Sequence, residues 1–404
     1  MKRVLFVIET LRGGGAERAL SNIVTHFPKD WHIDILVNDE SLIGYPFKGN
    51  ILSLSMPEKK SFIYYTKIII KRVFYLRKIK RSNGYDACIS FLDSANISNV
   101  LSGNKHCRTI VSVRSNMMSE KVGLTVKAGT RPLTKILYVH ADKIVAVSKE
   151  IEMILIHQLK LPSYKVKAIL NGYDRQWIRE RMRVDSSDKE SGGFFVSKDC
   201  KIVVTAGRLV EAKGQWHLIR AFSDVIRRVP QALLIVLGNG SLGEYLTELV
   251  QKYGLENNVI FIGYSENPFY YYAMADVFVL PSLYEGYPNA LAEAVCCGTP
   301  CVAADVHSGA REILAPSLDV MGERVSDISE EEYGILVPVC SGRKYRNYEP
   351  LEPEERKLTE AIVMLLNDSV KRQHYKQKSL ERSQELDINA IVDQWINVIL
   401  ENEE

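Results

Sequence analysis

Short apolar runs alternate with helical patterns along most of the chain. Each run has the length of a buried strand, and the intervening stretches have the spacing of helices that pack one face on a core. The runs are residues 4–8, 33–37, 87–91, 109–113, 143–147, 167–170, 202–206, 233–237, 259–262, 277–280 and 301–303. Strands that alternate with helices are typical of parallel sheets covered on both faces. The pattern therefore predicts an α/β protein with doubly wound, Rossmann-like domains.

A polar interval divides this series into two similar halves. Residues 184–193 contain Gly and Ser and no hydrophobic periodicity, so we place an interdomain linker there. We expect an N-terminal domain at 1–183, a C-terminal domain at 194–386 and a final helix within 387–404. A chain of 404 residues fits two domains of roughly 200 residues each.

Composition narrows the class of protein. Apolar residues at 46%, charged residues at 25% and a net charge of +3 are ordinary for a globular protein. Seven cysteines without a Cys-x-x-Cys pair argue against a disulfide framework and favour a reducing cytosol. The first apolar run follows Lys2 and Arg3 but ends at Glu9, so it fits a buried strand better than a signal peptide. No apolar run approaches the ~20 residues that a membrane-spanning helix needs.

The stretch 281–294 carries the most chemical information. Glu285 precedes a Gly-Tyr-Pro turn, and Glu293 lies about one helical turn beyond Asn289, where a helix is expected to begin. The free amides of a helix N-terminus favour an anion. One carboxylate can then face hydroxyls at the turn and the other hydroxyls farther along, with a phosphate between them. Such a stretch suits a sugar nucleotide, the donor in sugar transfer. The donor-binding residues predicted in it are Gly286, Tyr287, Asn289, Ala290, Leu291 and Glu293.

Two cations lie on the loop 207–214, which follows the first strand of the second half. Arg208 and Lys213 are candidates to stabilise a diphosphate leaving group, whose negative charge grows as a glycosidic bond breaks. We assign both a catalytic role together with Glu285. The alternative interpretation is a solvated basic loop.

Other loops at strand ends are rich in glycine. The Gly13-x-Gly15 start lacks the third glycine of a dinucleotide fingerprint, since Arg18 stands there, and NAD binding is therefore disfavoured. Gly14 and Gly15 remain able to approach a ligand without interference from a Cβ, although a plain tight turn is the alternative. Further donor-binding candidates follow the next strands of the second half and are Gly238, Asn239 and Tyr264.

The Glu285-x7-Glu293 pattern, flanked by two apolar strands, resembles the signature of retaining glycosyltransferases of family 4. This resemblance implies the GT-B fold, in which two Rossmann-like domains face a central cleft, with the acceptor on the N-terminal side and the nucleotide sugar on the C-terminal side. It implies that Glu285 contacts hydroxyls of the donor sugar and that Glu293 holds the ribose. It also implies that the last helix crosses back to the first domain.

The same resemblance extends to the loops. Arg208 and Lys213 correspond to residues that contact the diphosphate, the loop with Gly14 and Gly15 approaches the diphosphate and sugar, and the region of Tyr264 holds the base. Uridine diphosphate is expected from its prevalence in the family. One departure lies after the fourth strand, where many relatives have a histidine and this chain has Arg114 and Asn116, which we place on the acceptor or sugar side.

No metal or other cofactor is expected. The sequence has no Asp-x-Asp and no histidine and carboxylate cluster at metal spacing. The leaving diphosphate is the nearest base for the acceptor hydroxyl, which allows attack from the same face and retention of configuration.

Residues 59–81 contain nine lysines and arginines and no acidic residue. On a helical projection, one stripe is expected to face the core and contains Phe62, Tyr65, Ile69, Val73 and Leu76. Apolar residues beside a basic face suit an anionic membrane surface, and a merely solvated face is the alternative. No nucleic-acid motif accompanies the charge. The residues expected to face the membrane are Ile63, Lys67, Ile70, Lys71, Phe74 and Lys78.

The sequence thus predicts a retaining, metal-independent glycosyltransferase. We expect it to move a hexose or N-acetylhexosamine from a UDP-sugar to a lipid-linked oligosaccharide in capsule, exopolysaccharide or O-antigen synthesis, as a cytoplasmic protein on the inner membrane surface. Another GT-B enzyme, such as an epimerase or a phosphorylase, is an alternative. A catalytically silent sugar-nucleotide-binding scaffold is another, and replacement of Glu285 without loss of function would favour it.

Overall fold

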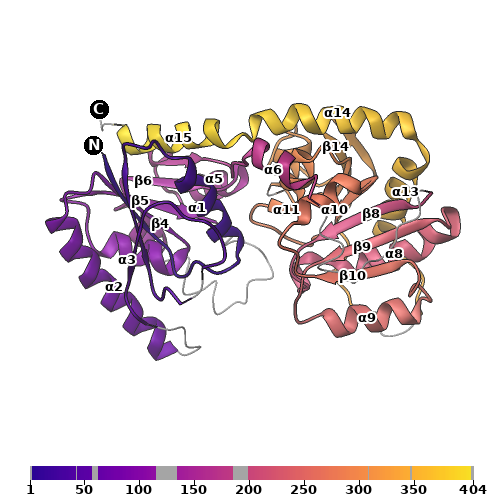
Figure 1. Ribbon diagram of the computed structural model, residues 1–404, viewed down its shortest axis with the longest axis horizontal. Helices are drawn as coiled ribbons and strands as arrows, with labels where there is room; N and C mark the ends of the chain where they lie inside the picture. The colour runs from indigo at the N-terminus through magenta and orange to yellow at the C-terminus, as the bar shows by residue number, and fades with distance from the viewer. Residues whose placement is uncertain are drawn as a thin grey trace. The chain divides into compact units, whose positions relative to one another are not determined.

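The computed structural model describes residues 2–41, 43–56, 62–114, 134–184, 199–307, 309–345 and 348–401. The chain forms two compact units, Met1–Gly172 with Asp387–Glu404 and Tyr173–Leu386. Each unit contains one seven-stranded sheet with helices packed on it (Figure 1). The predicted α/β class with two doubly wound sheets is confirmed.

The first sheet is parallel throughout and has the order β3-β2-β1-β4-β5-β6-β7. The order reverses between β1 and β4, and open α/β sheets bind ligands beyond the carboxyl ends of strands at such a point. The strands are β1 (Arg3–Val7), β2 (His32–Val37), β3 (Asn50–Ser53), β4 (Ala87–Phe91), β5 (Arg108–Val113), β6 (Lys143–Ala146) and β7 (Val166–Ala168).

Helices cover both faces of this sheet. Along β1, Val4 and Phe6 pack in the core shared with α1 and α15, whereas Leu5 and Val7 pack in the core shared with α2 and α3. A strand buried on both faces is apolar at every position, which explains its continuous hydrophobic sequence. The helices are α1 (Gly15–His26), α2 (Phe62–Ser82), α3 (Asp93–Leu101), α5 (Lys149–Met153) and α15 (Ile388–Leu400), with short helices η1 (Ile154–Gln158) and η2 (Ser163–Lys165).

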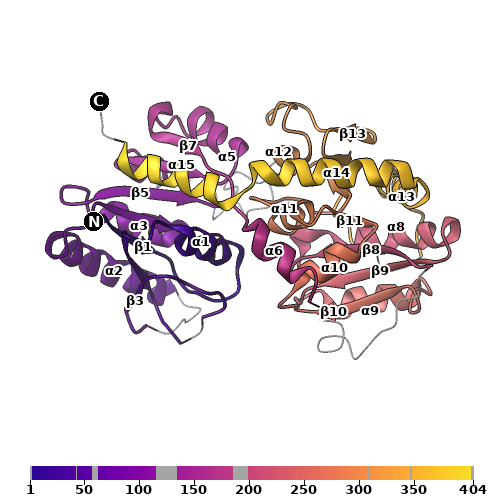
Figure 2. The ribbon, with the colours of Figure 1, turned by 45° about the horizontal axis from the view of Figure 1, so that its top comes forward.

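The last helix, α15, completes the core of the first unit. It runs beside α1 (Figure 2), and its Trp395 is fully buried and stacks on Phe91 with ring centroids 5.8 Å apart. Ile391, Val398 and neighbouring apolar residues of α15 lie in the same core. The first unit is therefore built from both ends of the chain.

The second sheet has the order β10-β9-β8-β11-β12-β14-β13, in which β13 alone runs antiparallel to its neighbour. The strands are β8 (Lys201–Ala206), β9 (Ala232–Leu237), β10 (Val259–Gly263), β11 (Val277–Leu280), β12 (Cys301–Ala304), β13 (Ser329–Glu331) and β14 (Gly334–Val337). The helices are α6 (Arg175–Arg181), α8 (Gln215–Arg228), α9 (Gly243–Lys252), α10 (Pro268–Met274), α11 (Asn289–Cys296), α12 (Ala310–Leu314), α13 (Pro353–Asn367) and α14 (Ser369–Glu385), with the short helix η3 (Glu211–Lys213).

The boundary between the units lies earlier than the expected domain end at residue 183. Helix α6 belongs to the second unit because Trp177 packs edge-on against Phe269, with ring centroids 5.3 Å apart. Asn267 Nδ2 also donates to the carbonyl oxygens of Arg181 and Val184, at 2.9 and 3.0 Å. Apart from Val184, the linker predicted at 184–193 lies outside the described residues.

The buried face of α2 differs in part from the predicted stripe. Val73 and Leu76 are buried as expected, but Tyr65 is 41% exposed. The core side of the helix also includes Arg72, which is fully buried, and Lys80. The sequence pattern assigns cations to the solvent, so it did not indicate that these two residues are buried.

Candidate functional site

Three loops meet at the carboxyl edge of the second sheet, after the adjacent strands β8, β9 and β10. Gly238 N donates to the carbonyl oxygen of Gly263 at 2.6 Å. A Cβ at Gly238, whose φ is +124°, would lie 2.1 Å from the carbonyl oxygen of Gly207. Only glycine allows this approach. The structure thus brings together the predicted loops 207–214, 238–240 and 263–264 at the edge where such sheets bind ligands.

The loop 207–214 is fixed to the segment that leads to Glu285. Leu283 N donates to the carbonyl oxygen of Ala212 at 2.8 Å, and Gly214 lies so close to Pro281 that a Cβ would be 2.4 Å from its carbonyl oxygen. On the other side, Gln215 Nε2 donates to the carbonyl oxygen of Arg208 at 3.1 Å. The two sequence motifs of the second half therefore form one surface.

Lys213 and Glu285, predicted separately from two motifs, form an ion pair. Lys213 Nζ lies 2.5 Å from Glu285 Oε1, and Ser282 Oγ donates to the same oxygen at 2.6 Å. The Lys213 side chain is 19% exposed and that of Glu285 8% exposed. Limited water strengthens such a pair relative to one at the open surface. An anion that binds Lys213 would compete with Glu285, whose carboxylate would then accept hydrogen bonds from hydroxyl groups.

Helix α11 follows the turn after Glu285. The amides of Asn289 and Leu291 donate to the carbonyl oxygens of Tyr287 and Pro288, at 3.1 and 3.0 Å, so the turn itself uses two of the amides expected for an anion. Asn289 Oδ1 accepts a hydrogen bond from the hydroxyl of Tyr173 at 2.6 Å. Glu293 lies farther along the helix and is 3% exposed.

Tyr287 and Tyr264 occupy opposite environments. Tyr287 is 8% exposed, burial raises its pKa, and its hydroxyl has no hydrogen-bond partner among the described residues. The ring therefore packs in the core, and the predicted role of Tyr287 in donor binding stays a prediction. Tyr264, after β10, is 56% exposed. Arg208 is also exposed on its loop.

In the first unit, Gly14 is the N-cap of α1. A Cβ at Gly14 would lie 2.2 Å from Glu17 Oε2, so the carboxylate of Glu17 folds over the start of the helix. Thr10 Oγ1 donates to the other oxygen of Glu17 at 3.3 Å. The N-terminus of α1, at Gly15, therefore lies next to the negative side chain of Glu17. The glycine pattern in the sequence did not indicate this.

Arg114 packs within the first unit. Its Nη1 donates to Asn171 Oδ1 at 2.5 Å, and its guanidinium carbon lies 4.4 Å from the ring centroid of Phe91 and 6.0 Å from that of Trp395. These contacts orient the side chain, and a role toward the acceptor or sugar stays a prediction. Asn116 lies outside the described residues.

The outer face of α2 combines cations with large apolar side chains. Phe74 is 65% exposed and Ile70 is 51% exposed. Lys67, Lys71 and Lys78 are exposed on the same helix, although Lys71 Nζ also donates to the carbonyl oxygen of Leu54 at 2.6 Å. The side chain of Ile63 is outside the described part of the structure. Throughout the described residues, every helix is too short or too polar to cross a bilayer.

Sequence reasoning missed three residues that shape this site, Ser282, Gln215 and Tyr173. Ser282 holds the carboxylate of Glu285, and its place three residues before the glutamate in the motif was a usable signal. Gln215 directly follows the loop 207–214 and fixes its backbone. Tyr173 reaches Asn289 from a distant part of the sequence, and no sequence signal pointed to it.

Comparisons with known proteins identify the family of the chain. A family model described as "Glycosyl transferases group 1" matches residues 187–319. An uncharacterized glycosyltransferase of Methanocaldococcus jannaschii is 32% identical over 361 residues, which cover 86% of this chain and 87% of that protein.

A second relative, from Campylobacter jejuni, is named N-acetylgalactosamine-N,N'-diacetylbacillosaminyl-diphospho-undecaprenol 4-alpha-N-acetylgalactosaminyltransferase. It is 24% identical over 405 residues, which cover 96% of each chain. Among solved structures, Anabaena HepE in complex with UDP and glucose matches all of both chains, with a TM-score of 0.74 and 19% sequence identity.

Two doubly wound units and these structural neighbours define a two-domain α/β protein of the GT-B class. The chain belongs to the glycosyl transferases of group 1, and its activity is that of a glycosyltransferase.

Proposed function

We propose that the protein transfers a hexose or N-acetylhexosamine from a UDP-sugar to a lipid-linked saccharide, with retention of configuration and without a metal ion. The reaction would extend a cell-surface polysaccharide at the cytoplasmic face of a membrane. The proposal combines the site of the second unit with the names of relatives, one of which acts on a diphospho-undecaprenol-linked saccharide.

The ion pair between Lys213 and Glu285 is the observation that carries the proposal. It places a cation, suited to a diphosphate, 2.5 Å from a carboxylate, suited to sugar hydroxyls. Such adjacency is what a sugar diphosphate requires, because its anionic and hydroxylated parts are joined by one bond. Anabaena HepE, a structural neighbour, was solved with UDP and glucose, which supports the choice of nucleotide.

The residues imply how the transfer would proceed. Lys213 and Arg208 would stabilise the charge that develops on the diphosphate as the bond between the sugar C1 and the phosphate oxygen breaks. Glu285, oriented by Ser282, would accept hydrogen bonds from the sugar hydroxyls and hold the ring. The acceptor oxygen forms the new bond to C1 from the same face, and its proton passes to the departing diphosphate.

A lipid-linked acceptor requires access to a membrane surface, and the outer face of α2 has suitable chemistry. Phe74 and Ile70 are exposed next to Lys67 and Lys78, which combines insertable apolar groups with charges that attract anionic lipids. Basic residues near such a surface contribute roughly 1 kcal/mol each. We assign this face to the anionic inner surface of the membrane.

The function is tested by measuring thermal shifts with a panel of UDP- and GDP-sugars, once in EDTA and once with an added divalent metal, for the wild type and for the Lys213→Ala and Glu285→Ala variants. We expect one UDP-sugar to stabilise the wild type in EDTA and Lys213→Ala to lose most of this shift. Turnover of that sugar, followed by NMR of the product anomer, then tests retention. A donor that stabilises the protein only when a metal is present would contradict the metal-free mechanism.

Assays of turnover and of cellular function separate the rival functions. An epimerase would convert the UDP-sugar without an acceptor, and a phosphorylase would require inorganic phosphate as co-substrate. A silent scaffold would bind a nucleotide sugar and keep its cellular function in the Glu285→Ala variant. Absence of any shift in folded protein would reject the transferase proposal.

A further inference from the structure

The segment between β14 and α13 wraps the start of α8, the helix that directly follows the loop 207–214. We call its described residues, 340–345 and 348–352, together with the first residues of α13, 353–355, the brace. Trp216 Nε1 donates to the carbonyl oxygen of Arg343 at 2.9 Å, and Gly342 N donates to His217 Nε2 at 3.1 Å. Trp216 and His217 are both fully buried. The brace therefore holds the first turn of α8 through side chains that have no exposure to water.

Next to this contact, a buried cluster of ionisable side chains joins α8 to the brace. His217 Nδ1 lies 2.8 Å from Glu355 Oε1, and Arg220 Nε donates to the same oxygen at 2.8 Å. Arg220 Nη2 donates to Glu355 Oε2 at 3.1 Å and to the carbonyl oxygen of Pro350 at 2.9 Å. Its guanidinium carbon lies 3.6 Å from the ring centroid of Tyr345. A fully bonded group of this kind fixes one arrangement of the brace on α8.

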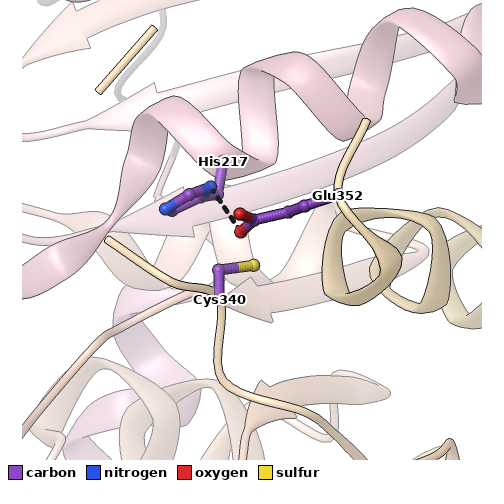
Figure 3. A group of neighbouring side chains, drawn as sticks. All are labelled: His217, Cys340 and Glu352. Carbon is purple, nitrogen blue, oxygen red and sulfur yellow. Dashed lines mark ion pairs between the residues drawn. The ribbon is translucent and has the colours of Figure 1, made fainter. Parts of the chain in front are cut away.

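His217, Cys340 and Glu352 converge at this place (Figure 3), and their candidate ligand atoms all lie within 4.8 Å of one another. The hydrogen bonds argue against a metal site. Since Gly342 N–H donates to Nε2, the network assigns the imidazole proton to Nδ1, which faces Glu355 and, at 3.3 Å, Glu352. A metal on Nδ1 would move the proton to Nε2 and set it against the Gly342 N–H.

Both carboxylate oxygens of Glu352 already accept hydrogen bonds from residues of the brace. Its Oε1 accepts from Ser341 N at 3.0 Å, and its Oε2 accepts from Ser341 Oγ at 2.7 Å and from the hydroxyl of Tyr345 at 2.9 Å. Burial and the nearby carboxylates raise the pKa of Cys340, so its sulfur is a neutral thiol. The cluster therefore attaches the brace to α8 through hydrogen bonds.

The brace reaches the loop 207–214 by two routes. Lys344 Nζ pairs directly with Glu211 Oε1 at 2.5 Å, and Glu211 lies two residues before Lys213. The second route runs through α8, since Gln215, next to Trp216, donates to the carbonyl oxygen of Arg208 at 3.1 Å. Both cations assigned to the diphosphate therefore lie on backbone that the brace restrains.

We propose that the brace positions the loop 207–214 for the donor diphosphate, with Trp216, His217 and Lys344 as positioning residues that do not touch the substrate. This inference rests on the proposed function for the identity of the ligand. It does not rest on it for the order of the loop, which is a property of the ligand-free protein. The two are therefore measurable separately.

The test compares the wild type with the Lys344→Ala, Lys344→Arg and Trp216→Phe variants. Lys371→Ala is the matched control, because Lys371 Nζ pairs with Glu330 at 2.6 Å on other elements of the same unit. Hydrogen exchange of peptides that cover 207–214 is measured without ligand, and the Kd of UDP is measured by calorimetry. The amides of Leu209 and Lys213, which donate to the carbonyl oxygens of Asn239 and Val210, report on the loop.

We expect Lys344→Ala to speed exchange of the loop and to weaken UDP binding by about two- to fivefold, as for one partly exposed ion pair. Trp216→Phe, which loses a buried hydrogen bond, should weaken it by about three- to tenfold. Lys344→Arg should restore wild-type values, and Lys371→Ala should keep them. A purely structural role would lower the melting temperature without changing the Kd of the folded protein.

Unchanged loop exchange, or an unchanged Kd of UDP, in folded Lys344→Ala and Trp216→Phe would overturn the inference. A wild type that binds neither UDP nor GDP would instead remove the proposed function. In that event the exchange data alone decide whether the brace orders the loop.

Discussion

Lys213 illustrates how one side chain can serve two states of the site. Without a donor it pairs with Glu285 at 2.5 Å, and with a donor it would pair with the diphosphate. The ion pair compensates the charge of a lysine that has little access to water, because an unpaired charge in such a place raises the free energy of the folded protein. It also sets the lysine near the place where a phosphate would enter.

This exchange of partners predicts different binding for two variants. Lys213→Ala should weaken UDP binding, whereas Glu285→Gln should bind UDP at least as well as the wild type because it removes the competing carboxylate. Both should lose turnover by roughly 10²–10³-fold, as when one group that stabilises the transition state is removed. Calorimetry with UDP and steady-state kinetics check this, and weaker UDP binding in Glu285→Gln would contradict it.

A second residue pair predicts a pH dependence. Arg311 donates from Nε and Nη2 to the two oxygens of Asp305, both at 2.8 Å, and the side chains are 3% and 0% exposed. Burial acts to raise the pKa of Asp305, but the hydrogen bonds from Arg311 and from Val325 N–H outweigh it and hold the pKa below its ordinary value of 3.8. The pair therefore stabilises the fold above this value, and its contribution is lost as the pH falls through the lower pKa of the folded state.

Accordingly, Asp305→Asn should lower the free energy of unfolding at neutral pH by about 3–5 kcal/mol, because it leaves Arg311 buried without its charged partner. The variant should then lose less stability than the wild type below about pH 4. Urea unfolding at several pH values measures both effects. Asp327→Asn, which removes an exposed carboxylate paired with Lys357, is the control and should change little.

Residue-level chemistry was only partly predictable from the sequence. Lys213, Arg208 and Glu285 could be found because charged residues at strand ends, in recognisable motifs, have few structural explanations. The buried cations Arg72 and Arg220 could not, because their partners lie far away in the sequence. Arg72 donates to Asn38, Ser94 and Ser98, and Arg220 bonds to Glu355, so only the folded chain shows why a cation is tolerated there.

At the scale of elements, α2 has two unlike faces. Arg72 points inward and bonds to Asn38 Oδ1 at 2.5 Å, while Phe74 and Ile70 point outward and are more than half exposed. A helix fixed from within by hydrogen bonds can present an apolar outer face without losing its orientation. This arrangement suits a rigid surface that contacts a membrane.

We therefore expect the double variant Ile70→Ser, Phe74→Ser to lose most of its binding to vesicles that contain anionic lipid, roughly tenfold or more, because two insertable side chains are gone. Co-sedimentation with neutral and anionic vesicles measures the effect. Val370→Ser is the matched control, since Val370 is 78% exposed on α14 and lies outside this face. Equal loss of binding in the control would reject the assignment of α2.

Most strands were predictable because strands buried on both faces are apolar throughout. The strands β3 and β13 were missed for physical reasons, and β14 was missed although it is apolar. β3 lies at the edge of its sheet, and its four residues are half-buried or exposed, so they lack a continuous apolar run. β13 (Ser329–Glu331) carries two glutamates that hide its pairing with β14 (Gly334–Val337). β14 itself is apolar and fully buried, so its sequence was a usable signal.

At the scale of the whole molecule, the alternation of strands and helices was enough to predict two doubly wound sheets. It was not enough to place the boundary, because α6 follows the last strand of the first sheet in sequence yet packs on α10 of the second unit. Helix amphipathicity indicates that a face is buried but not against which partner. Tertiary packing supplied that information.

The contribution of α15 to the first unit gives a test at this scale. A chain that ends after Leu386 lacks Trp395 and the other α15 residues of that core. We expect the amides of β1 and β4 to lose their protection from hydrogen exchange, since the loss of a single buried tryptophan already costs about 3–5 kcal/mol. Strands β8 and β9, in the other unit, should stay protected.

A chain shortened only by residues 402–404 is the control for this truncation and should exchange as the full chain does. Retained protection of β1 and β4 in the longer truncation would mean that the first unit folds without α15.

The same helix constrains the order in which the protein can fold during synthesis. The strands of the first unit are made first, but α15 follows the whole of the second unit, Tyr173–Leu386. Ribosomes add about 5–20 residues per second. The apolar surface of the first unit that α15 later covers therefore stays exposed for roughly 10–50 s during synthesis. The part of the chain that is translated later is thus the first able to complete its core, and the earlier part needs protection from aggregation in the meantime.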